Sequence, residues 1–319
     1  MAEIGKDISK AKALLEQGEL VAIPTETVYG LAGNALDVNA VTKIFKVKDR
    51  PYFDPLIVHV ADLNSAHNLV ETIPAKAEKL ANKFWPGPLT ILLKRKNIIP
   101  DLVTAGLETV GIRCPDHFLT NELLRSINFP LAAPSANPFG YVSPTNPDHV
   151  NEQLGDKIKY ILGGGECKVG IESTIVGFEN DEPIIYRLGG LSVEQIESVI
   201  GRATVQLNAS SNPQAPGQLK SHYAPRKKLI LESLSTSIKK YQSVKVGVLC
   251  FQEKVSGIDP KNQRILSPTG NLEIAAQHLF SALRELDKLD IEFILVEEVL
   301  DDGIGRAIND RLRRAAVKE

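Results

Sequence analysis

Short apolar runs that stop at proline, glycine or charged residues constrain the fold of this chain more than any other feature. A buried strand needs only such a run, and turn-forming residues limit its length. Apolar residues at helical spacing separate several of the runs, as at Leu14, Leu80 and Phe84. Strands that alternate with helices are typical of an α/β domain. The strands predicted on this basis are residues 20–23, 56–60, 89–93, 109–113, 130–133, 160–162 and 184–187.

A change of composition at residues 203–226 divides the chain. Ser, Asn, Pro, Gln and Gly dominate there and no apolar period is visible, which is typical of a linker. Strands and helices alternate again beyond it, which predicts a smaller parallel α/β domain. We therefore expect a first domain at 1–202, a linker at 203–226 and a C-terminal domain at 227–319. The elements expected in the last are strands 229–231, 244–251 and 291–296 and helices 272–289 and 304–316.

Composition narrows the classes of protein to consider. The net charge of -2 argues against a protein that coats nucleic acid, so any such contact would need a local patch. The three cysteines lie far apart and form no CxxC motif, so we expect no disulfide framework or zinc site, and a cytoplasmic location. The N-terminus lacks the pattern of a signal peptide, and no apolar run is long enough to span a membrane.

The stretch at residues 131–145, LAAPSANPFGYVSPT, predicts a strand that leads into a stiff loop. Pro134, Pro138 and Pro144 each lack a backbone donor and fix φ, so no regular element runs through them. The loop presents hydroxyl and amide groups from Ser135 and Asn137. Groups held in place in this way suit a polar ligand, although a proline-rich surface loop would have the same sequence.

Many other polar residues lie at predicted strand ends, where open α/β sheets bind their ligands. Cations and hydroxyls predominate, catalytic carboxylate pairs are scarce and no metal-ligand cluster is seen, so we predict no metal held by protein side chains alone. Such a set suits a ligand with several negative oxygens, such as a nucleoside triphosphate together with a carboxylic acid. The residues are Thr25, Thr27, Tyr29, Lys48, Arg50, Arg113, Ser135, Asn137, Ser143, Ser173 and Arg187.

The roles of His59 and of the linker leave alternatives open. His59 lies in the predicted strand 56–60 and is either a hydrogen-bonded core histidine or a ligand contact at the end of the strand. His222 and Tyr223 are unusual residues for a passive spacer. The linker is therefore either a tether or a loop that covers a site.

Several ordered motifs together resemble the threonylcarbamoyl-AMP synthase family with its YrdC-like domain. The resemblance covers about residues 7–200, and HYAP in the linker and GIGRAINDRLRRAA near the C-terminus extend it to the family's long form. It implies a twisted, open, mixed YrdC-like sheet with helices, followed by a smaller Rossmann-like parallel α/β domain. The motifs are PTETVYGL, KVKDRPYFDPLIVHV, FWPGPLTILLK, VGIRCPDH, APSANPFGYVSPT and GIESTIV.

The resemblance implies a reaction. L-Threonine, bicarbonate or CO2, and ATP would give L-threonylcarbamoyl-AMP and pyrophosphate, with Mg2+ accompanying the ATP. The enzyme would be a nucleotidyltransferase, and a separate tRNA threonylcarbamoyl transferase would use its product to modify tRNA. A weak contact with tRNA itself is also compatible with the resemblance.

The same resemblance assigns roles to individual residues. Catalysis would fall to Lys48, Arg50, Ser135 and Asn137. The residues expected around L-threonine are Thr27, His59, Arg113, Ser135 and Ser173. Those expected around ATP are Lys48, Arg50, Asp54, Asn137, Ser143 and Arg187, and His222 and Tyr223 would cover the site.

One segment departs from the family pattern. Members carry a small or polar pair after Arg-Pro and then Asn-Pro-Leu, whereas this chain has Tyr52 and Phe53 followed by Asp54. A carboxylate beside ATP phosphates would repel them unless it binds magnesium or a hydrogen-bond donor. The ATP contact that the resemblance assigns to Asp54 therefore falls on a residue that departs from the family pattern.

Two other functions are compatible with the sequence. One is an RNA-binding YrdC-like module, because basic residues cluster near the C-terminus, although such a run is more often a solvated helix face. The other is a carbamoyl-transfer relative that uses a different amine. The basic cluster consists of Arg306, Arg311, Arg313, Arg314 and Lys318.

Overall fold

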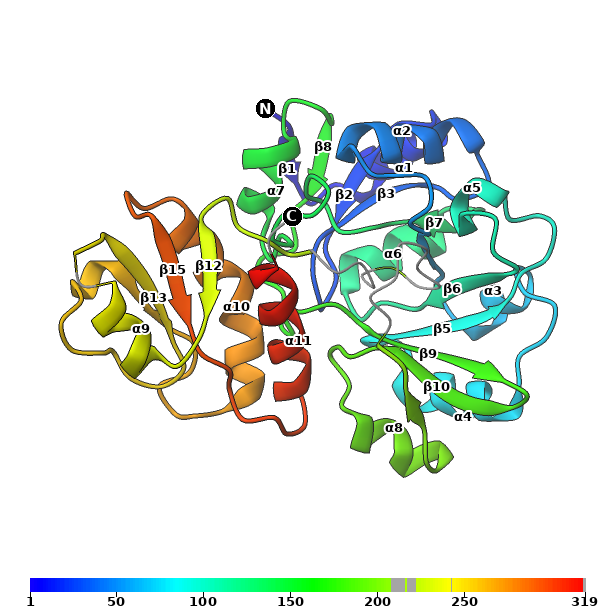
Figure 1. The fold of residues 1–319 in the computed structure, drawn as a ribbon. Coiled ribbons are helices and arrows are strands. Elements are labelled where there is room, and N and C mark those ends of the chain that lie inside the picture. The colour runs from blue at the N-terminus through cyan, green and yellow to red at the C-terminus, as the bar shows by residue number, and fades with distance from the viewer. Residues whose placement is uncertain (208–215, 217–221, 242, 318–319) are drawn as a thin grey trace.

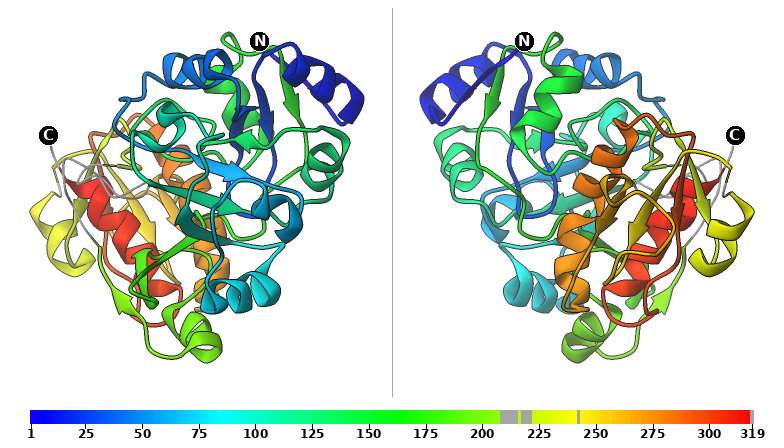
Figure 2. Two further views of the ribbon diagram at one scale, coloured as in Figure 1. Left: turned by 90° about the vertical axis from the view of Figure 1, so that its right-hand side faces the viewer. Right: turned by 90° about the vertical axis from the view of Figure 1, so that its left-hand side faces the viewer.

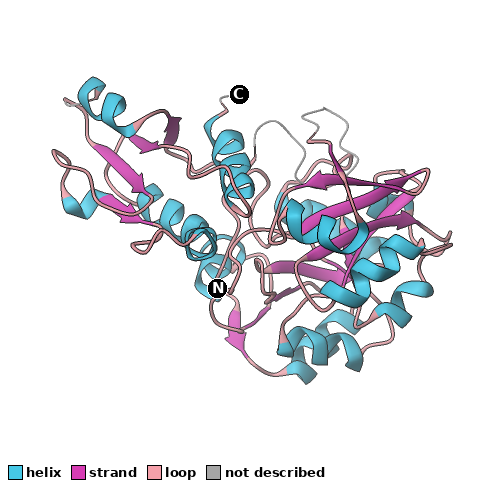
Figure 3. Ribbon diagram, turned by 90° about the horizontal axis from the view of Figure 1, so that it is seen from below, coloured by secondary structure: helices cyan, strands magenta, loops and turns pink. Residues whose placement is uncertain are grey.

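A computed structural model describes residues 1–207, 216, 222–241 and 243–317 of the chain. Two sheets organise these residues, a large one in the first part of the chain and a small one in the C-terminal part (Figure 1). Seen from below, the two sheets lie apart with helices between them (Figure 3).

The large sheet is mixed, as the resemblance implies. Parallel pairs such as β4–β6 and β5–β9 occur beside antiparallel pairs such as β5–β6. In spatial order its strands are β1 (Glu3–Gly5), β8 (Tyr160–Leu162), β2 (Val21–Ile23), β3 (Gly30–Asn34), β7 (Leu131–Ala132), β4 (Ile57–His59), β6 (Thr109–Arg113), β5 (Leu89–Lys94), β9 (Thr174–Glu179), β10 (Glu182–Arg187) and β11 (Thr204–Val205).

Helices pack around this sheet (Figure 2). Several begin at a side chain that accepts a hydrogen bond from the first turn, including α8, where Ser192 and Gln195 form a capping box. The helices of this part are α1 (Ile8–Glu16), α2 (Val38–Lys48), α3 (Leu63–His67), α4 (Ala75–Phe84), α5 (Asp101–Thr104), α6 (Phe118–Ser126), α7 (Pro147–Leu154) and α8 (Val193–Ile200).

The small sheet is entirely parallel, in the order β12, β15, β13, β14, which confirms the predicted parallel α/β C-terminal domain. Its strands are β12 (Lys228–Leu231), β13 (Val246–Cys250), β14 (Gln263–Ile265) and β15 (Phe293–Val296). The helices are α9 (Leu234–Lys240), the 3-10 turn η1 (Pro260–Asn262), α10 (Leu272–Asp287) and α11 (Gly305–Ala316).

The C-terminal domain packs against the first domain. Helices α10 and α11 lie on the side of the small sheet that faces the large one (Figure 1). One hydrophobic cluster contains Val142 and Val150 together with Phe280 and Leu312. The two domains therefore share a core across the interface.

Two strands of the large sheet, β3 and β9, are not among the strands predicted from the sequence. Gly30 and Gly33 belong to β3, where a Cβ on Gly33 would lie 2.9 Å from Leu20 Cδ2. Glycine is used there because neighbouring side chains approach the backbone, a requirement that strand propensity does not reveal. Strand β9 follows the glycine-rich segment at 163–170, and β11 lies inside the predicted linker. No helix in the described part of the chain is both long and apolar enough to cross a membrane.

Candidate active site

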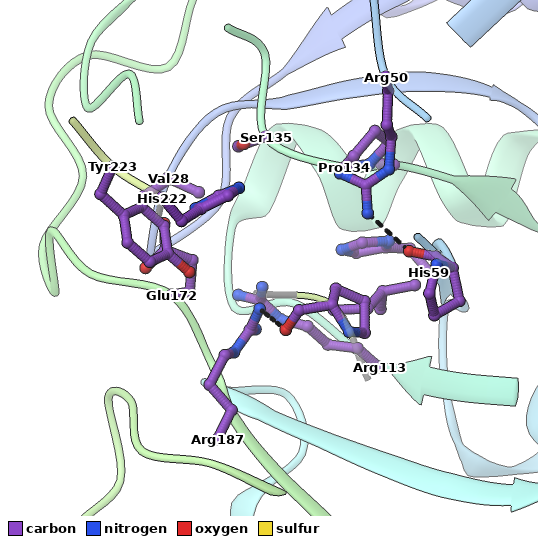
Figure 4. A pocket seen from close by; sticks show the side chains of 14 residues that line it. Val28, Arg50, His59, Arg113, Pro134, Ser135, Glu172, Arg187, His222 and Tyr223 are labelled. Atoms are coloured by element: carbon purple, nitrogen blue, oxygen red, sulfur yellow. Dashed lines mark hydrogen bonds between the residues drawn. The ribbon is translucent and has the colours of Figure 1, made fainter. Parts of the chain in front are cut away.

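A cavity of about 50 Å3 opens at strand ends of the large sheet (Figure 4). The structure brings many of the predicted residues to its walls. Those that line it are Arg50, His59, Arg113, Ser135, Arg187, His222 and Tyr223. Predicted residues that are buried beside it and do not line it are Thr27, Lys48, Asp54, Asn137, Ser143 and Ser173.

Arg113 is the last residue of β6 and is held by two buried partners. Its Nη2 donates to Glu26 Oε1 at 2.7 Å and to Thr27 Oγ1 at 2.8 Å. Glu26 is itself fixed, because its Oε2 accepts a hydrogen bond from the backbone N–H of Asp116 at 3.0 Å. The guanidinium is therefore aimed before any ligand arrives, and its planar fork suits a carboxylate.

His59, at the end of β4, is buried and also lines the cavity. It therefore combines features of both alternatives that the sequence left open, a core histidine and a residue at a ligand site. Burial, and then the charge of Arg113, lowers its pKa to about 3. The ring is therefore neutral at physiological pH. Its Nδ1 has no hydrogen-bond partner among the described residues.

Lys48 ends α2 and holds the loop that follows β7. Its Nζ donates to the carbonyl of Ser135 at 2.6 Å and to the carbonyl of Asn137. The Asn137 side chain in turn donates to the carbonyls of Pro138 and Tyr141 at 2.8 and 2.9 Å. Burial, and then the charge of Arg50, lowers the pKa of Lys48 well below its ordinary value.

Arg50 and Asp54 form a buried ion pair, with 2.9 Å between Arg50 Nη2 and Asp54 Oδ2. The alignment is poor, and neither carboxylate oxygen of Asp54 accepts a hydrogen bond from a described residue. Arg50 also donates to the backbone carbonyls of Asp54 and Pro55 at 3.1 and 2.7 Å. Asp54 therefore compensates the positive charge of Arg50 from behind the cavity wall. Tyr52 and Phe53, by contrast, lie at the surface.

Arg187 ends β10 and reaches Ser173, with Nε donating to its carbonyl and Nη2 to its hydroxyl, both at 3.0 Å. Its Nη1 donates to the carbonyl of Pro216 in the linker at 3.1 Å. Burial lowers the pKa of Arg187 to about 10, so the side chain stays charged at neutral pH. This cation thus joins the sheet to the linker at the edge of the cavity.

His222 and Tyr223 close the other side of the cavity. Their rings meet edge to face with centroids 4.1 Å apart, and Tyr223 stacks on Phe280 of α10 at 5.6 Å. Tyr223 has a positive φ of 62°, which is uncommon for a bulky residue. Both residues line the cavity, whereas residues 208–215 and 217–221 of the linker lie outside the described residues.

The comparisons with known proteins cover nearly the whole chain. One family model, described as "Telomere recombination", matches residues 13–189, and another, described as "Threonylcarbamoyl-AMP synthase, C-terminal domain", matches residues 191–317. A Bacillus subtilis protein named threonylcarbamoyl-AMP synthase is 42% identical over 97% of this chain and 92% of its own length. The chain belongs to the threonylcarbamoyl-AMP synthase family.

A second family member, from Pyrococcus abyssi, is 39% identical over 96% of this chain and 93% of its own length. The crystal structure of P. abyssi Sua5, complexed with L-threonine, is similar over 97% of this chain and 94% of that one, with a TM-score of 0.90. The resemblance identified from the motifs is thus confirmed, together with the fold class.

Two charged residues at the site of this family member were missed by sequence reasoning. Glu172 lines the cavity, and it lies next to Ser173, which the motif GIESTIV did indicate. Arg311 comes from α11 and donates from Nε to Glu172 Oε2 at 2.9 Å. Nothing local in the sequence links two residues that lie so far apart along the chain.

The interpretation of the C-terminal basic cluster is wrong for two of its members. Arg311 and Arg314 are buried and paired with Asp310, so they form neither a solvated face nor a basic surface for RNA. Arg306 pairs with Glu194 and Arg313 with Glu298. Lys318 lies outside the described residues. The described part of the cluster is therefore neutralised by carboxylates.

Proposed function

We propose that this family member is a nucleotidyltransferase that makes L-threonylcarbamoyl-AMP and pyrophosphate from ATP, L-threonine and bicarbonate or CO2. The observation that carries the proposal is the convergence of Arg50, Arg113 and Arg187 on one cavity. Cations gathered in a water-poor site stabilise the charge that develops on phosphoryl and carboxylate oxygens. The similarity to named synthases over almost the full chain supports the same reaction.

In this proposal Arg113 binds the carboxylate of L-threonine, because Glu26 and Thr27 hold its guanidinium at the end of β6. His59, which stays neutral, supplies a ring nitrogen to the substrate without adding charge. Ser135 and Ser173 provide hydroxyl groups close by. The threonine amine adds to CO2 and loses a proton, which gives a carbamate whose oxygen is the nucleophile of the next step.

The carbamate oxygen then attacks the α-phosphorus of ATP, and the bond to the pyrophosphate oxygen breaks. We assign charge stabilisation in this step to Arg50 and Arg187, which line the cavity. Lys48 and Asn137 act from behind, since they hold the loop that carries Ser135. Ser143 and Asp54 belong to the nucleotide side of the site as buried supports.

Magnesium would enter with the phosphates of ATP. Among the described residues there is no group of three His, Cys, Asp or Glu side chains that is able to hold a metal ion, which fits an ion carried mainly by the nucleotide. When bound, it would neutralise the leaving pyrophosphate. The protein's part would be to orient that complex with its arginines.

The linker residues would have to move during each turnover. A cavity of about 50 Å3 is far smaller than the roughly 300–1,000 Å3 of a typical ligand site. We therefore propose that Pro216, His222 and Tyr223 form a cover that opens to admit substrates. Closure would exclude water from the reactive adenylate.

We place the reaction in the cytoplasm, a location that suits the free thiols of Cys114, Cys167 and Cys250. The mixed anhydride would be consumed by a tRNA threonylcarbamoyl transferase. Any direct contact with tRNA would use surfaces other than the buried arginines of α11.

Pyrophosphate release from ATP tests the proposal. With magnesium present, release should require both L-threonine and bicarbonate, and mass spectrometry should detect threonylcarbamoyl-AMP. L-Serine and L-valine in place of L-threonine serve as matched controls for the carbamoyl-transfer alternative. Release that ignores the amino acid would contradict the proposal.

A further inference from the structure

The C-terminal domain reaches the cavity through one buried side chain. Arg311 of α11 is 1% exposed and donates from Nη2 to the carbonyl of Leu188 at 2.8 Å and from Nη1 to Asp310 at 2.8 Å. Its Nε donates to Glu172 Oε2, and its guanidinium lies 5.1 Å from the ring of Tyr223. Each nitrogen of the guanidinium therefore has a hydrogen-bond acceptor.

Glu172 is the partner through which Arg311 affects the charge of the cavity. It lines the cavity together with Arg187 and Tyr223, and Figure 4 shows it beside the Tyr223 ring. Its Oε1 accepts a hydrogen bond from the Ser143 hydroxyl at 2.6 Å. A hydroxyl donor does not neutralise a carboxylate, whereas Arg311 does.

A second residue of the C-terminal domain holds the segment that carries Ser143. Arg284 of α10 donates to the carbonyl of Ser143 at 3.3 Å and to that of Val142. Asp287, one turn later, accepts from the Tyr141 hydroxyl at 2.7 Å. The C-terminal domain therefore contacts both partners of the hydrogen bond between Ser143 and Glu172. Arg284 donates to the backbone of Ser143, and Arg311 pairs with Glu172.

We propose that Arg311 is a positioning residue for ATP, and that the C-terminal domain thereby completes the nucleotide side of the site. It acts by neutralising Glu172, whose charge would otherwise face the phosphates of the substrate. The inference rests on the proposed function, since it needs a polyanion in the cavity. It gives the C-terminal domain an electrostatic role in the reaction.

The test compares full-length variants for binding of a non-hydrolysable ATP analogue with magnesium, by calorimetry, and for KM and kcat. Arg311→Met should weaken binding of the analogue and raise the KM for ATP by about tenfold to a hundredfold, because an unpaired buried carboxylate then faces it. The KM for L-threonine should change much less. Arg311→Met combined with Glu172→Gln should recover most of the affinity, because the repelling charge is gone.

The matched control is Arg313→Met, which removes an exposed arginine of the same helix that pairs with Glu298 and should leave both KM values unchanged. Wild-type protein must first show threonine-dependent pyrophosphate release; if it does not, the proposed reaction falls before this inference is tested. With that activity present, a double variant that binds the analogue no better than Arg311→Met would overturn the inference.

If Arg311→Met fails to fold, the single variant Glu172→Gln tests the inference instead. In the wild-type background, this change should bind the analogue at least as tightly as the unaltered protein, since it removes negative charge and keeps Arg311. Binding weakened by about tenfold or more would show that the pair is needed for shape and not for charge, which also overturns the inference.

Discussion

The two sides of the cavity are built in different ways. Arg50, His59 and Arg113 stand at or near strand ends of the large sheet, and their partners belong to the same domain. On the other side, Glu172 and Tyr223, which lie together in Figure 4, contact Arg311 and Phe280 of the C-terminal domain. The first side is held by partners from its own domain, whereas the second is also held by residues of the C-terminal domain. A ligand site can thus combine a rigid anchor with a wall that interdomain packing assembles.

The largest effect is expected at the rigid side. Arg113→Met should destabilise the protein by about 3–5 kcal/mol, because Glu26 is left buried without its cation. L-Threonine binding should fall with it. Adding Glu26→Gln should restore much of the free energy of unfolding, measured by denaturant titration, and leave L-threonine binding impaired. Threonine binding that recovers together with stability would contradict the assignment of Arg113 as the carboxylate clamp.

A smaller effect is expected at the packed side. Tyr223→Ala removes the ring between Arg311 and Phe280 and should lower kcat/KM by as much as about 100-fold, since the cover is no longer held in place. Tyr223→Phe keeps the ring and should stay close to wild type. Equal rates for the alanine and wild-type proteins would show that the cover is dispensable.

The pH dependence of stability sharpens the comparison, because His59 belongs to the rigid side. Its pKa is about 3 in the folded chain and near 6.5 when unfolded. Between these values the unfolded chain binds a proton that the folded chain excludes, so stability is lost as the pH falls. The slope should approach about 1.4 kcal/mol per pH unit.

His59→Gln should flatten this slope between about pH 6 and pH 4, measured by denaturant titration at each pH. His149 and His222 also have lowered pKa values and contribute in the same direction, so the relevant quantity is the difference between variant and wild type. A slope that does not change would show that His59 is protonated in the folded protein.

The smallest effect is expected at an exposed contact between the domains. Arg306 of α11 pairs with Glu194 of α8 near the surface, whereas the pair made by Arg311 and Glu172 is buried. Arg306→Met should cost at most about 1 kcal/mol and leave the KM for ATP unchanged, because exposed ion pairs contribute little. A rise in that KM comparable to that of Arg311→Met would erase the distinction between the two arginines.

Much of the fold was accessible from local patterns. Apolar runs bounded by turn residues predicted β6 and β8 at their observed bounds. The glycine strand β3 was missed because its residues are chosen for close packing against Leu20 and Ala133, which lie in other strands or loops. Propensity describes a residue's own backbone, and it does not describe what approaches that backbone.

The sequence by itself determined that some distant residues meet at the cavity, such as Arg113 at a strand end and Ser135 on a proline-stiffened loop. Only the tertiary structure decided what each charge faces. Lys48 donates to two backbone carbonyls, and Asp54 forms an ion pair with Arg50. Arg311 of the C-terminal domain forms an ion pair with Glu172 of the first domain. The physical reason is that burial makes the energy of a charge depend on its nearest partner, and chain separation does not reveal that partner.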